Sequence, residues 1–229
     1  MSSTSKPALK IDWATHEAAK YACENWHYSK CIPKSKLVKI GAWEDGKFIG
    51  VVIFGYGATA ALGAPYGLTM QECVELTRVA LTSHVNPVSK ILALAIKYLK
   101  NHCPGIKLIV SFADKTQGHH GGIYQATNWI YAGQTSSAMF YRDPSGKLWH
   151  PRRASKTPNK QKQLVTSEWK EELQQGKYRY LMPLNYEIKA RISVLSKPYP
   201  KREKQAMSVP TEQRRCDTDL HAPHYLAEL

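Results

Sequence analysis

The stretch from Ser111 to Trp129 gathers side chains that could transfer protons or bind a polar substrate. These residues are Asp114, His119, His120, Tyr124 and Gln125. A carboxylate at the end of a strand can accept a proton, an imidazole has a pKa near neutrality, and a tyrosine hydroxyl can donate to a leaving group or an oxyanion. Glycines at positions 118, 121 and 122 let the backbone approach a substrate closely. The composition predicts a polar site for acid–base chemistry.

Each of these candidates also has a structural interpretation. Asp114 is typical of a residue that caps a turn, and paired histidines in a glycine-rich loop are often simply solvated. Tyr124 is also compatible with an amphipathic position in the core. Asn128 favours a turn or a cap over contact with a substrate.

Two further candidates lie outside this stretch. His27-Tyr28 falls where the first helix is expected to end, and the helix dipole would stabilise a histidine cation there. Arg78 interrupts an otherwise apolar strand, so its guanidinium needs an anionic partner. That partner is either Glu75 or Asp114 in a structural role, or a phosphate or carboxamide group of a ligand.

Local patterns predict the elements that position these residues in the first half of the chain. Residues 14–25 are rich in alanine and predict a helix capped by Asp12. Two apolar runs flank Asp45-Gly46, a dipeptide typical of type I′ hairpin turns. The alternation in ECVELTRVAL, residues 72–81, favours a strand, with a helix from a Thr69-x-x-Glu72 capping box as the alternative.

The second half begins with a helix expected over residues 87–102, with Asn86 as its cap and Pro87 in its first turn. The apolar run 106–112 predicts a buried strand, and residues 121–128 predict a short helix. Further strands are expected at 129–133, 138–142, 147–150 and 177–184, and a helix at 167–176.

Composition narrows the class of protein. The 229 residues are 43% hydrophobic, enough for one sizeable core, and contain no run of about 18 apolar residues that would span a membrane. The N-terminus lacks an apolar signal region, so we expect a cytoplasmic protein. The five cysteines form no CxxC pair. Their spacing favours reduced thiols and supports neither a disulfide framework nor a structural zinc site.

The charge indicates a polyanionic partner. Lys and Arg number 32 against 18 Asp and Glu, which gives a net charge of +14. Residues 147–204 alone hold 15 basic and 5 acidic side chains. Concentrated positive charge is what contacts with nucleic-acid phosphates require, although a basic surface can also serve only solubility.

The order of elements predicts an α/β protein with a mostly antiparallel mixed sheet and helices on both faces. We expect a catalytic domain over residues 1–150. Residues 151–205 would form a basic C-terminal extension, whose helix and strand pack on the core or complete it. The last residues, 206–229, mix charge and proline without periodicity, and disorder is expected there.

The succession of strand, helix, strand and short helix resembles the GNAT acyltransferase fold. Within that fold, the chain resembles the Mom proteins of Mu-like bacteriophages. The stretches that carry this resemblance are ENWHYSK, KIGAWEDGKFIGVVIFGYG, YGLTMQECVELTRVALT, SFAD…GHHGGIYQATNWIYAG and KYRYLMPL…PYPKR. The resemblance implies an enzyme that converts adenine in phage DNA to its N6-carbamoylmethyl (acetamido) form and protects that DNA from host restriction. The host cell cytoplasm is then the expected location.

The sequence departs from a typical GNAT protein at two positions. The turn 83–89 has no glycine, whereas a typical GNAT turn reads Q/R-x-x-G-x-G/A and holds the CoA diphosphate with backbone N–H groups. Ordinary CoA binding is therefore in question. The usual acid tyrosine would fall at Trp129, and the nearest tyrosines are Tyr124 and Tyr131.

The resemblance also suggests roles for individual residues. A flipped adenine of double-stranded DNA is the expected substrate, because its N6 is otherwise stacked in the duplex. The expected catalytic residues are Asp114, Tyr124, His27 and Arg78. The expected donor-binding residues are Ser111, Asn86, Ser89 and Asn128. The expected substrate-binding residues are Tyr28, His119, His120 and Gln125. The sequence leaves metal involvement and the oligomeric state, a homodimer included, open.

The sequence leaves two alternatives for the acyl donor. An acetyl group from acetyl-CoA contains no nitrogen and would need a separate nitrogen source to give the carbamoylmethyl product. A glycyl group contains the required atoms, so an activated glycine such as glycyl-tRNA is the other hypothesis, with tRNA as a further partner. Two rival functions are a GNAT-type N-acyltransferase for a protein or small-molecule amine, and a non-catalytic DNA-binding protein.

Overall fold

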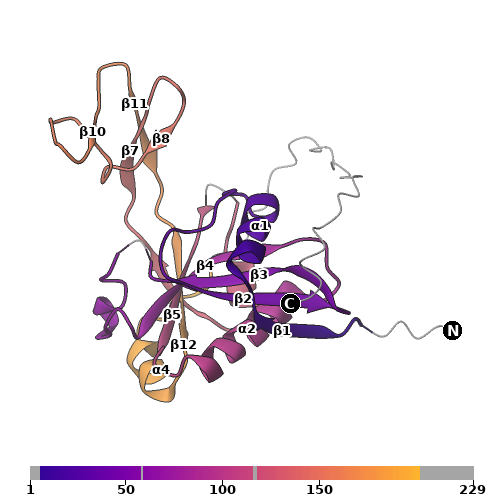
Figure 1. Ribbon diagram of the computed structural model, residues 1–229. Helices are drawn as coiled ribbons and strands as arrows, with labels where there is room; N and C mark the ends of the chain where they lie inside the picture. Colours follow the sequence, from indigo (N-terminus) through magenta and orange to yellow (C-terminus); the bar gives the residue numbers. More distant parts are fainter. Residues whose placement is uncertain (1–5, 58, 116–117, 202–229) are drawn as a thin grey trace.

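The computed structural model describes residues 6–57, 59–115 and 118–201 (Figure 1). A seven-stranded sheet forms the centre of this part of the chain, with strands in the order β1-β2-β3-β4-β5-β12-β6. The bounds of these strands are Leu9–Trp13 (β1), Leu37–Glu44 (β2), Lys47–Gly55 (β3), Cys73–Leu81 (β4), Leu108–Ala113 (β5), Tyr178–Pro183 (β12) and Ile130–Gln134 (β6). The tail for which disorder is expected, 206–229, lies outside the described residues.

The central sheet is mixed, and this confirms the expected α/β class with a mostly antiparallel sheet. Neighbouring strands run antiparallel except β4 and β5, which are parallel. The parallel pairing joins only residues 73–75 to residues 108–110. Beyond Glu75, β4 has an extra residue, Thr77, opposite its other neighbour β3. Such a bulge bends a strand, so β4 and β5 separate in the middle of the sheet.

Helices cover both faces of the sheet, as expected. On one face lie α2 (Val88–His102) and α3 (Gly122–Gln125), which pack against side chains such as Phe54. On the other face lie α1 (His16–Trp26) and α4 (Tyr186–Ser193). Because side chains alternate along a strand, Val52 of β3 packs in the hydrophobic core on the α2 face of the sheet. Its neighbour Val51 packs in the core on the α1 face. The buried core is therefore divided by the sheet.

The helix predicted over residues 14–25 begins two residues later, and its predicted cap is wrong. The Thr15 hydroxyl accepts a hydrogen bond of 3.1 Å from the Ala18 amide and caps α1. Asp12 lies within β1 instead, where it accepts a hydrogen bond of 2.8 Å from the Tyr98 hydroxyl. Pairing of β1 with β2 holds the residue extended, away from the start of the helix.

The predicted hairpin is confirmed. Strands β2 and β3 are joined at Asp45 and Gly46, whose φ angles are +47° and +80°. Two consecutive residues with positive φ are what a type I′ turn requires, and Asp-Gly is well suited to them. The twist of this turn matches the twist of the strands, so the dipeptide fixes their register.

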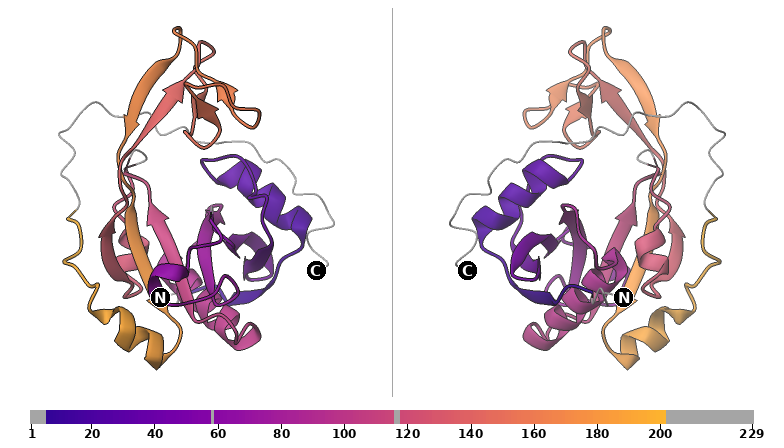
Figure 2. Two further views of the ribbon diagram at one scale, coloured as in Figure 1. Left: turned by 90° about the vertical axis from the view of Figure 1, so that its left-hand side faces the viewer. Right: turned by 90° about the vertical axis from the view of Figure 1, so that its right-hand side faces the viewer.

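Residues 138–174 form a separate unit between β6 and β12, which we call the inserted unit. Figures 1 and 2 show it projecting beyond the end of the sheet, on the side where α1 lies. Its three-stranded sheet has the order β11-β7-β8, and two short strands, β9 and β10, pair beside it. The bounds are Ala138–Arg142 (β7), Leu148–Trp149 (β8), Ala154–Ser155 (β9), Gln163–Leu164 (β10) and Lys170–Gln174 (β11).

The expected boundary at residue 150 falls inside the inserted unit, because β7 and β8 precede it and β11 follows it. The helix predicted over residues 167–176 is wrong, since part of this segment forms β11. Its Glu and Lys content favours a helix in isolation, but β11 pairs along its whole length with β7. Arg142 donates two hydrogen bonds, of 2.9 and 2.6 Å, to the Glu172 carboxylate across this pair. Cross-strand contacts of this kind override local propensity.

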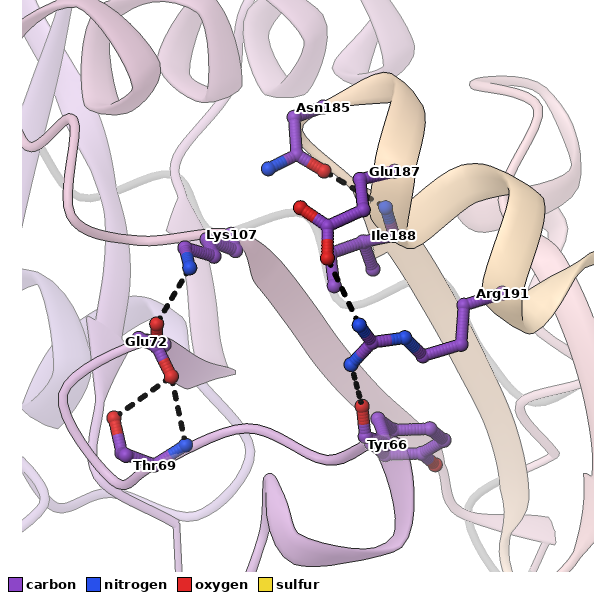
Figure 3. Close-up of polar contacts among 8 residues, drawn as sticks. All are labelled: Tyr66, Thr69, Glu72, Lys107, Asn185, Glu187, Ile188 and Arg191. Carbon is purple, nitrogen blue, oxygen red and sulfur yellow. Dashed lines mark hydrogen bonds and ion pairs between the residues drawn. The ribbon is translucent and has the colours of Figure 1, made fainter.

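After the inserted unit, the chain forms β12, which completes the central sheet. Helix α4 follows and packs against one face of that sheet (Figure 3). Asn185 caps α4 by accepting from the Ile188 amide at 2.9 Å. The Arg191 guanidinium donates at 3.0 Å to the carbonyl of Tyr66, which ends the short 3-10 helix η1 (Ala64–Tyr66). The loop after η1 contains Thr69 and Glu72, the two residues of the alternative helix start.

These two residues do bond to each other, but no helix follows them. The Glu72 carboxylate accepts from both the amide and the hydroxyl of Thr69 at 2.9 Å, and from the Lys107 ammonium at 2.6 Å (Figure 3). The next residue, Cys73, begins β4. The strand interpretation of residues 72–81 is therefore confirmed, and the bonds of Glu72 fix the loop that leads into it.

Candidate active site

A cleft of about 1240 Å³ opens where β4 and β5 separate. Its sheet side is formed by residues 75–79 of β4, residues 112–114 at the end of β5, and the loop and helix 118–124. The loop that follows α1, residues 26–28, forms another wall. The inserted unit closes the remaining side with residues that include Phe140, His150 and Arg152. The cleft therefore lies between the central sheet and the inserted unit.

Seven of the predicted site residues line this one cleft. They are His27, Tyr28, Arg78, Asp114, His119, His120 and Tyr124. They come from three parts of the chain that are far apart in the sequence, namely the end of α1, β4, and the segment from the end of β5 through α3. All four predicted catalytic side chains are among them.

Tyr124 is nearly buried at the sheet side of the cleft. Its ring packs between Trp129 and Tyr180, with centroid distances of 5.0 and 4.9 Å, and its side chain is 9% exposed. Burial raises the pKa of Tyr124 to about 12, although a hydrogen bond with Ser111 opposes this shift. The hydroxyl is therefore protonated at neutral pH and can act as a donor. Tyr131, the other tyrosine near the Trp129 position, does not line the cleft.

Ser111 positions this tyrosine. Its hydroxyl oxygen lies 2.8 Å from the Tyr124 hydroxyl and 3.1 Å from the Leu76 carbonyl oxygen. Ser111 is completely buried and does not line the cleft. The hydroxyl that was predicted to bind a donor group is thus bonded within the protein, between β4, β5 and α3.

His27 is buried beside Arg78. Its Nδ1 accepts a hydrogen bond of 3.1 Å from the Ser29 amide, which assigns the proton of the neutral ring to Nε2. Burial, together with the nearby charges of Arg78 and His119, lowers the pKa of His27 to about 4. His27 is therefore an uncharged hydrogen-bond donor at neutral pH. This differs from the interpretation as a cation at the end of a helix, because burial disfavours the charged ring.

Arg78 connects β4 to the loop that follows α1. It donates to the Thr77 carbonyl at 2.7 Å and to the Cys31 carbonyl at 3.4 Å. Both of these partners are uncharged, so the bonds orient the guanidinium without neutralising it. Because arginine has five N–H donors, the group retains the capacity to bind a ligand in the cleft.

Asp114 lies at the end of β5 with a lysine beside it. The Lys177 ammonium is 2.7 Å from a carboxylate oxygen of Asp114, whose side chain is 19% exposed. The backbone carbonyl of Asp114 accepts from the His119 amide at 3.1 Å and closes the intervening loop. Lys177 also lines the cleft, and sequence reasoning missed it. The only signal was a lysine at the first position of a predicted strand, which is too common to indicate a site.

Two of the predicted substrate-binding residues, Tyr28 and His119, contact each other in the lining of the cleft. Tyr28 is 54% exposed, and its ring makes an edge-to-face contact with the His119 ring at a centroid distance of 5.7 Å. Tyr28 also stacks obliquely on His27 at 4.3 Å. An exposed aromatic face beside polar groups is well suited to stacking on a planar ligand.

The loop before α3 is fixed by contacts with β12. The His120 carbonyl accepts from the Tyr180 hydroxyl at 2.6 Å and from the Gln125 amide at 3.2 Å. Gly121 has a φ of +84°, and a Cβ there would lie 2.3 Å from the Tyr180 ring. Gln125 thus holds the loop and does not line the cleft.

The structure does not bring the remaining predicted residues to the cleft. Asn128 is exposed in the turn before β6, where its φ of +60° is left-handed. Asn86 and Ser89 lie at the start of α2. Asn86 does not cap the helix through its side chain, contrary to the prediction.

Glu75 is a further cleft residue that sequence reasoning did not assign to the site. It was considered only as a structural partner of Arg78. Its position becomes clear from the pairing, since it is the last residue of β4 that pairs with β5. The side chains of the inserted unit could not be placed either, because nothing local shows which way the unit projects.

Two features are absent from the described residues. No group of three or more His, Cys, Asp or Glu side chains there could hold a metal ion. No described helix is long and apolar enough to cross a membrane. The four cysteines in this part of the chain are unpaired thiols, and burial raises the pKa of Cys23 to about 11 and that of Cys73 to about 12.

A mixed sheet whose parallel central strands separate to form a cleft is the arrangement expected of a GNAT-like fold. Comparison with known sequences is more specific. The model of the Mom protein family matches residues 8–201, so the chain belongs to this family. A relative in the family, the methylcarbamoylase Mom of Escherichia phage Mu, is 24% identical over 211 residues, which cover 84% of each chain.

Solved structures that match part of this shape include two acetyltransferases. The aminoglycoside acetyltransferase AAC(6′)-Ib in complex with coenzyme A is 10% identical, with a TM-score of 0.46, and the match covers 81% of this chain and 99% of the other. A putative acetyltransferase from Acinetobacter baylyi ADP1 is 14% identical, with a TM-score of 0.44 and coverages of 80% and 94%.

Proposed function

We propose that this protein is a phage DNA-modification enzyme that converts adenine to N6-carbamoylmethyl adenine and acts in the infected host cell. Membership of the Mom family carries this proposal, together with the similarity to the methylcarbamoylase of phage Mu. The convergence of Arg78, Asp114 and Tyr124 on one cleft supports it, since a transferase must hold an acceptor and a donor together. The modified bases would protect the phage DNA from host restriction enzymes.

The cleft has room for an extruded base and a small activated group. Its volume of about 1240 Å³ exceeds that of many small-molecule pockets, which hold roughly 300–1,000 Å³. The exposed Tyr28 ring stacks on the purine, with His119 at its edge. Extraction of the base is required because adenine N6 cannot be attacked within the stacked duplex.

The chemistry needs a proton acceptor for N6 and a donor for the developing negative charge. Asp114 accepts the proton that N6 loses when its nitrogen attacks the donor carbonyl carbon. The His27 Nε2–H and the Arg78 guanidinium stabilise the oxyanion, and the Tyr124 hydroxyl protonates the leaving group as the bond from carbon to that group breaks. Lys177 keeps Asp114 oriented through its ion pair.

The donor is an activated acyl group, and we retain the glycyl ester as the donor that supplies every atom of the product. Transfer of glycyl to N6 gives N6–CO–CH₂–NH₂. Attack of its free amine on C6 and release of the amide nitrogen from C6 then give the isomer N6–CH₂–CO–NH₂, with the amine nitrogen as the new N6. An acetyl donor would need a nitrogen source in addition.

The inserted unit provides a surface for the DNA backbone. It holds eight basic and four acidic residues, and its side chains line the cleft opposite β4. Arg152 and Arg153 are exposed on it. Figure 2 shows the unit projecting beyond the sheet, a position from which it could contact a duplex. Phosphate contacts there would orient the duplex over the site.

Expression of the chain with a plasmid tests this function. Digestion with an adenine-sensitive restriction enzyme, followed by mass analysis of the nucleosides, should show protected DNA that contains carbamoylmethyl deoxyadenosine. Unmodified DNA together with tight, salt-sensitive binding would indicate a non-catalytic DNA-binding protein. Transfer to a protein or small-molecule amine with unmodified DNA would indicate an ordinary acyltransferase.

A further inference from the structure

The turn between β4 and α2 contains a carboxylate where a GNAT-type fold would hold the diphosphate of CoA. Glu44, at the end of β2, is 8% exposed. Its carboxylate accepts from the Val85 amide at 2.9 Å, from the Asn86 amide at 2.6 Å and from the Asn86 side-chain amide at 2.8 Å. The backbone donors that precede α2 are therefore already bonded to a negatively charged group of the protein.

The surrounding contacts hold this carboxylate in place. Asn86 is completely buried, and its side-chain amide also donates to the Pro7 carbonyl at 3.1 Å. Its side-chain oxygen accepts from the Lys90 ammonium at 2.7 Å. The tip of the first hairpin, the segment before β1 and the first turn of α2 are thus joined through one asparagine and one glutamate.

Glu44 remains charged at neutral pH. Burial raises the pKa of its carboxyl group, but the hydrogen bonds from Val85 and Asn86 more than offset this, so the pKa lies below its ordinary value. A diphosphate at the same amides would have to displace the carboxylate and would experience its repulsion. The turn also lacks the glycines that would let a phosphate approach the backbone.

We propose that Glu44 closes the N-terminal end of α2 to phosphate groups, so that the acyl donor is not a CoA thioester anchored there through its diphosphate. Asn86, one of the residues predicted to bind the donor, stabilises this closed arrangement instead. The carrier of the acyl group is then held by the cleft and by the basic inserted unit. This inference rests on the GNAT-like fold and not on the identity of the acceptor, so it can fail while DNA modification stands.

Direct binding measurements test the inference. Coenzyme A and inorganic pyrophosphate are titrated into the wild-type chain, Glu44→Gln and Glu44→Ala by calorimetry, and the amide signals of Val85 and Asn86 are followed by NMR. Glu24→Gln, which removes the same charge from an exposed position on α1, is the matched control. Thermal melting establishes that each variant is folded.

We expect no saturable binding at the Val85 and Asn86 amides of the wild type or of Glu24→Gln up to about 1 mM ligand. At least one Glu44 variant should bind pyrophosphate there at least about tenfold more tightly. Wild-type binding at these amides would overturn the inference, and so would folded Glu44 variants that bind no better than the wild type. If neither variant folds, the wild-type titration alone decides between the two outcomes.

Discussion

The two sides of the cleft differ in how their polar groups are held. On the sheet side, Tyr124 and His27 are each 9% exposed and are bonded to neighbouring elements. On the inserted unit, Arg152 and Arg153 are exposed, and the unit joins the sheet through only two connections. Groups that must be placed accurately for a reaction are positioned by packing, whereas groups that contact a flexible polyanion need only charge and reach. The comparison predicts different consequences of mutation on the two sides.

The largest effect is expected for Asp114→Asn. The change keeps the shape of the side chain but removes the proton acceptor, so modification should fall at least about 100-fold. Quantitative nucleoside mass analysis after plasmid co-expression measures this loss, with the surface variant Glu24→Gln as control. Full modification by the folded variant would remove Asp114 from the proposed mechanism.

Tyr124→Phe is expected to lower turnover about 100-fold while the ring continues to pack between Trp129 and Tyr180. The matched control is Tyr131→Phe, which removes a hydroxyl from β6 outside the cleft. Single-turnover rates on saturating DNA compare the two. Equal rates for the two variants would mean that the Tyr124 hydroxyl serves only the core.

Acid should destabilise the protein through His27. Because the pKa of His27 is lowered from 6.5 to about 4, the unfolded state takes up a proton first as the pH falls. The stability that depends on the neutral ring is present above pH 6.5 and is lost progressively as the pH falls through about 4. His27→Gln should reduce this loss by about 1–3 kcal/mol in denaturant titrations at a series of pH values. His102→Gln, a change on the exposed surface of α2, should leave the loss as it is in the wild type.

Two glycine variants compare loop positions of similar backbone conformation. Gly121→Ala places a methyl group against the Tyr180 ring at a φ of +84° and should cost more than about 2 kcal/mol of unfolding free energy. Gly118 has a φ of +69° with open space around it, so Gly118→Ala should cost only about 1–2 kcal/mol. Equal melting temperatures would mean that the Tyr180 contact does not fix the loop.

The smallest effect on stability is expected on the inserted unit. Arg153→Gln with Lys160→Gln, two exposed positions of the inserted unit that do not line the cleft, should leave the melting temperature and the turnover on saturating DNA unchanged. DNA affinity should weaken, and the slope of log K against log[salt] should fall by about 0.9 for each phosphate that the protein no longer neutralises. Lys97→Gln with Lys100→Gln removes the same charge from the exposed surface of α2 and should affect binding less. Equal effects of the two pairs would mean that charge alone, and not its position, attracts DNA.

Short-range sequence patterns were sufficient to predict the elements whose structure is determined by neighbouring residues. Asp45-Gly46 specifies its own turn, and the apolar spacing of residues 88–99 specifies the buried face of α2. The sequence also indicated which residues would meet at the cleft, because Asp114 and Tyr124 follow one strand and Arg78 lies on its neighbour. In each case the determining residues lie within one or two elements of each other.

The wrong or missing predictions concern residues whose contact partners are distant in the sequence. Asn86 has the composition of a helix cap, but Glu44 and Pro7 bind its side chain from more than 40 residues away. The segment containing β11 has helical composition, yet β7 pairs with it across the whole inserted unit. Lys177 meets Asp114 only because β12 lies beside β5. No local pattern carries information about these contacts.

The position of β12 inside the sheet has a consequence for the order of folding. Ribosomes would release β1 to β6 well before β12, so the growing chain would hold an incomplete sheet in which β5 and β6 are not yet joined. Closing a long loop is slow, because its entropy must be lost before the contact is made. Pairing of β7 with β11 brings Thr135 and Lys177 together, where their backbones are bonded at 2.9 Å. Early formation of this hairpin would therefore shorten the loop and guide the last strand into its gap during synthesis.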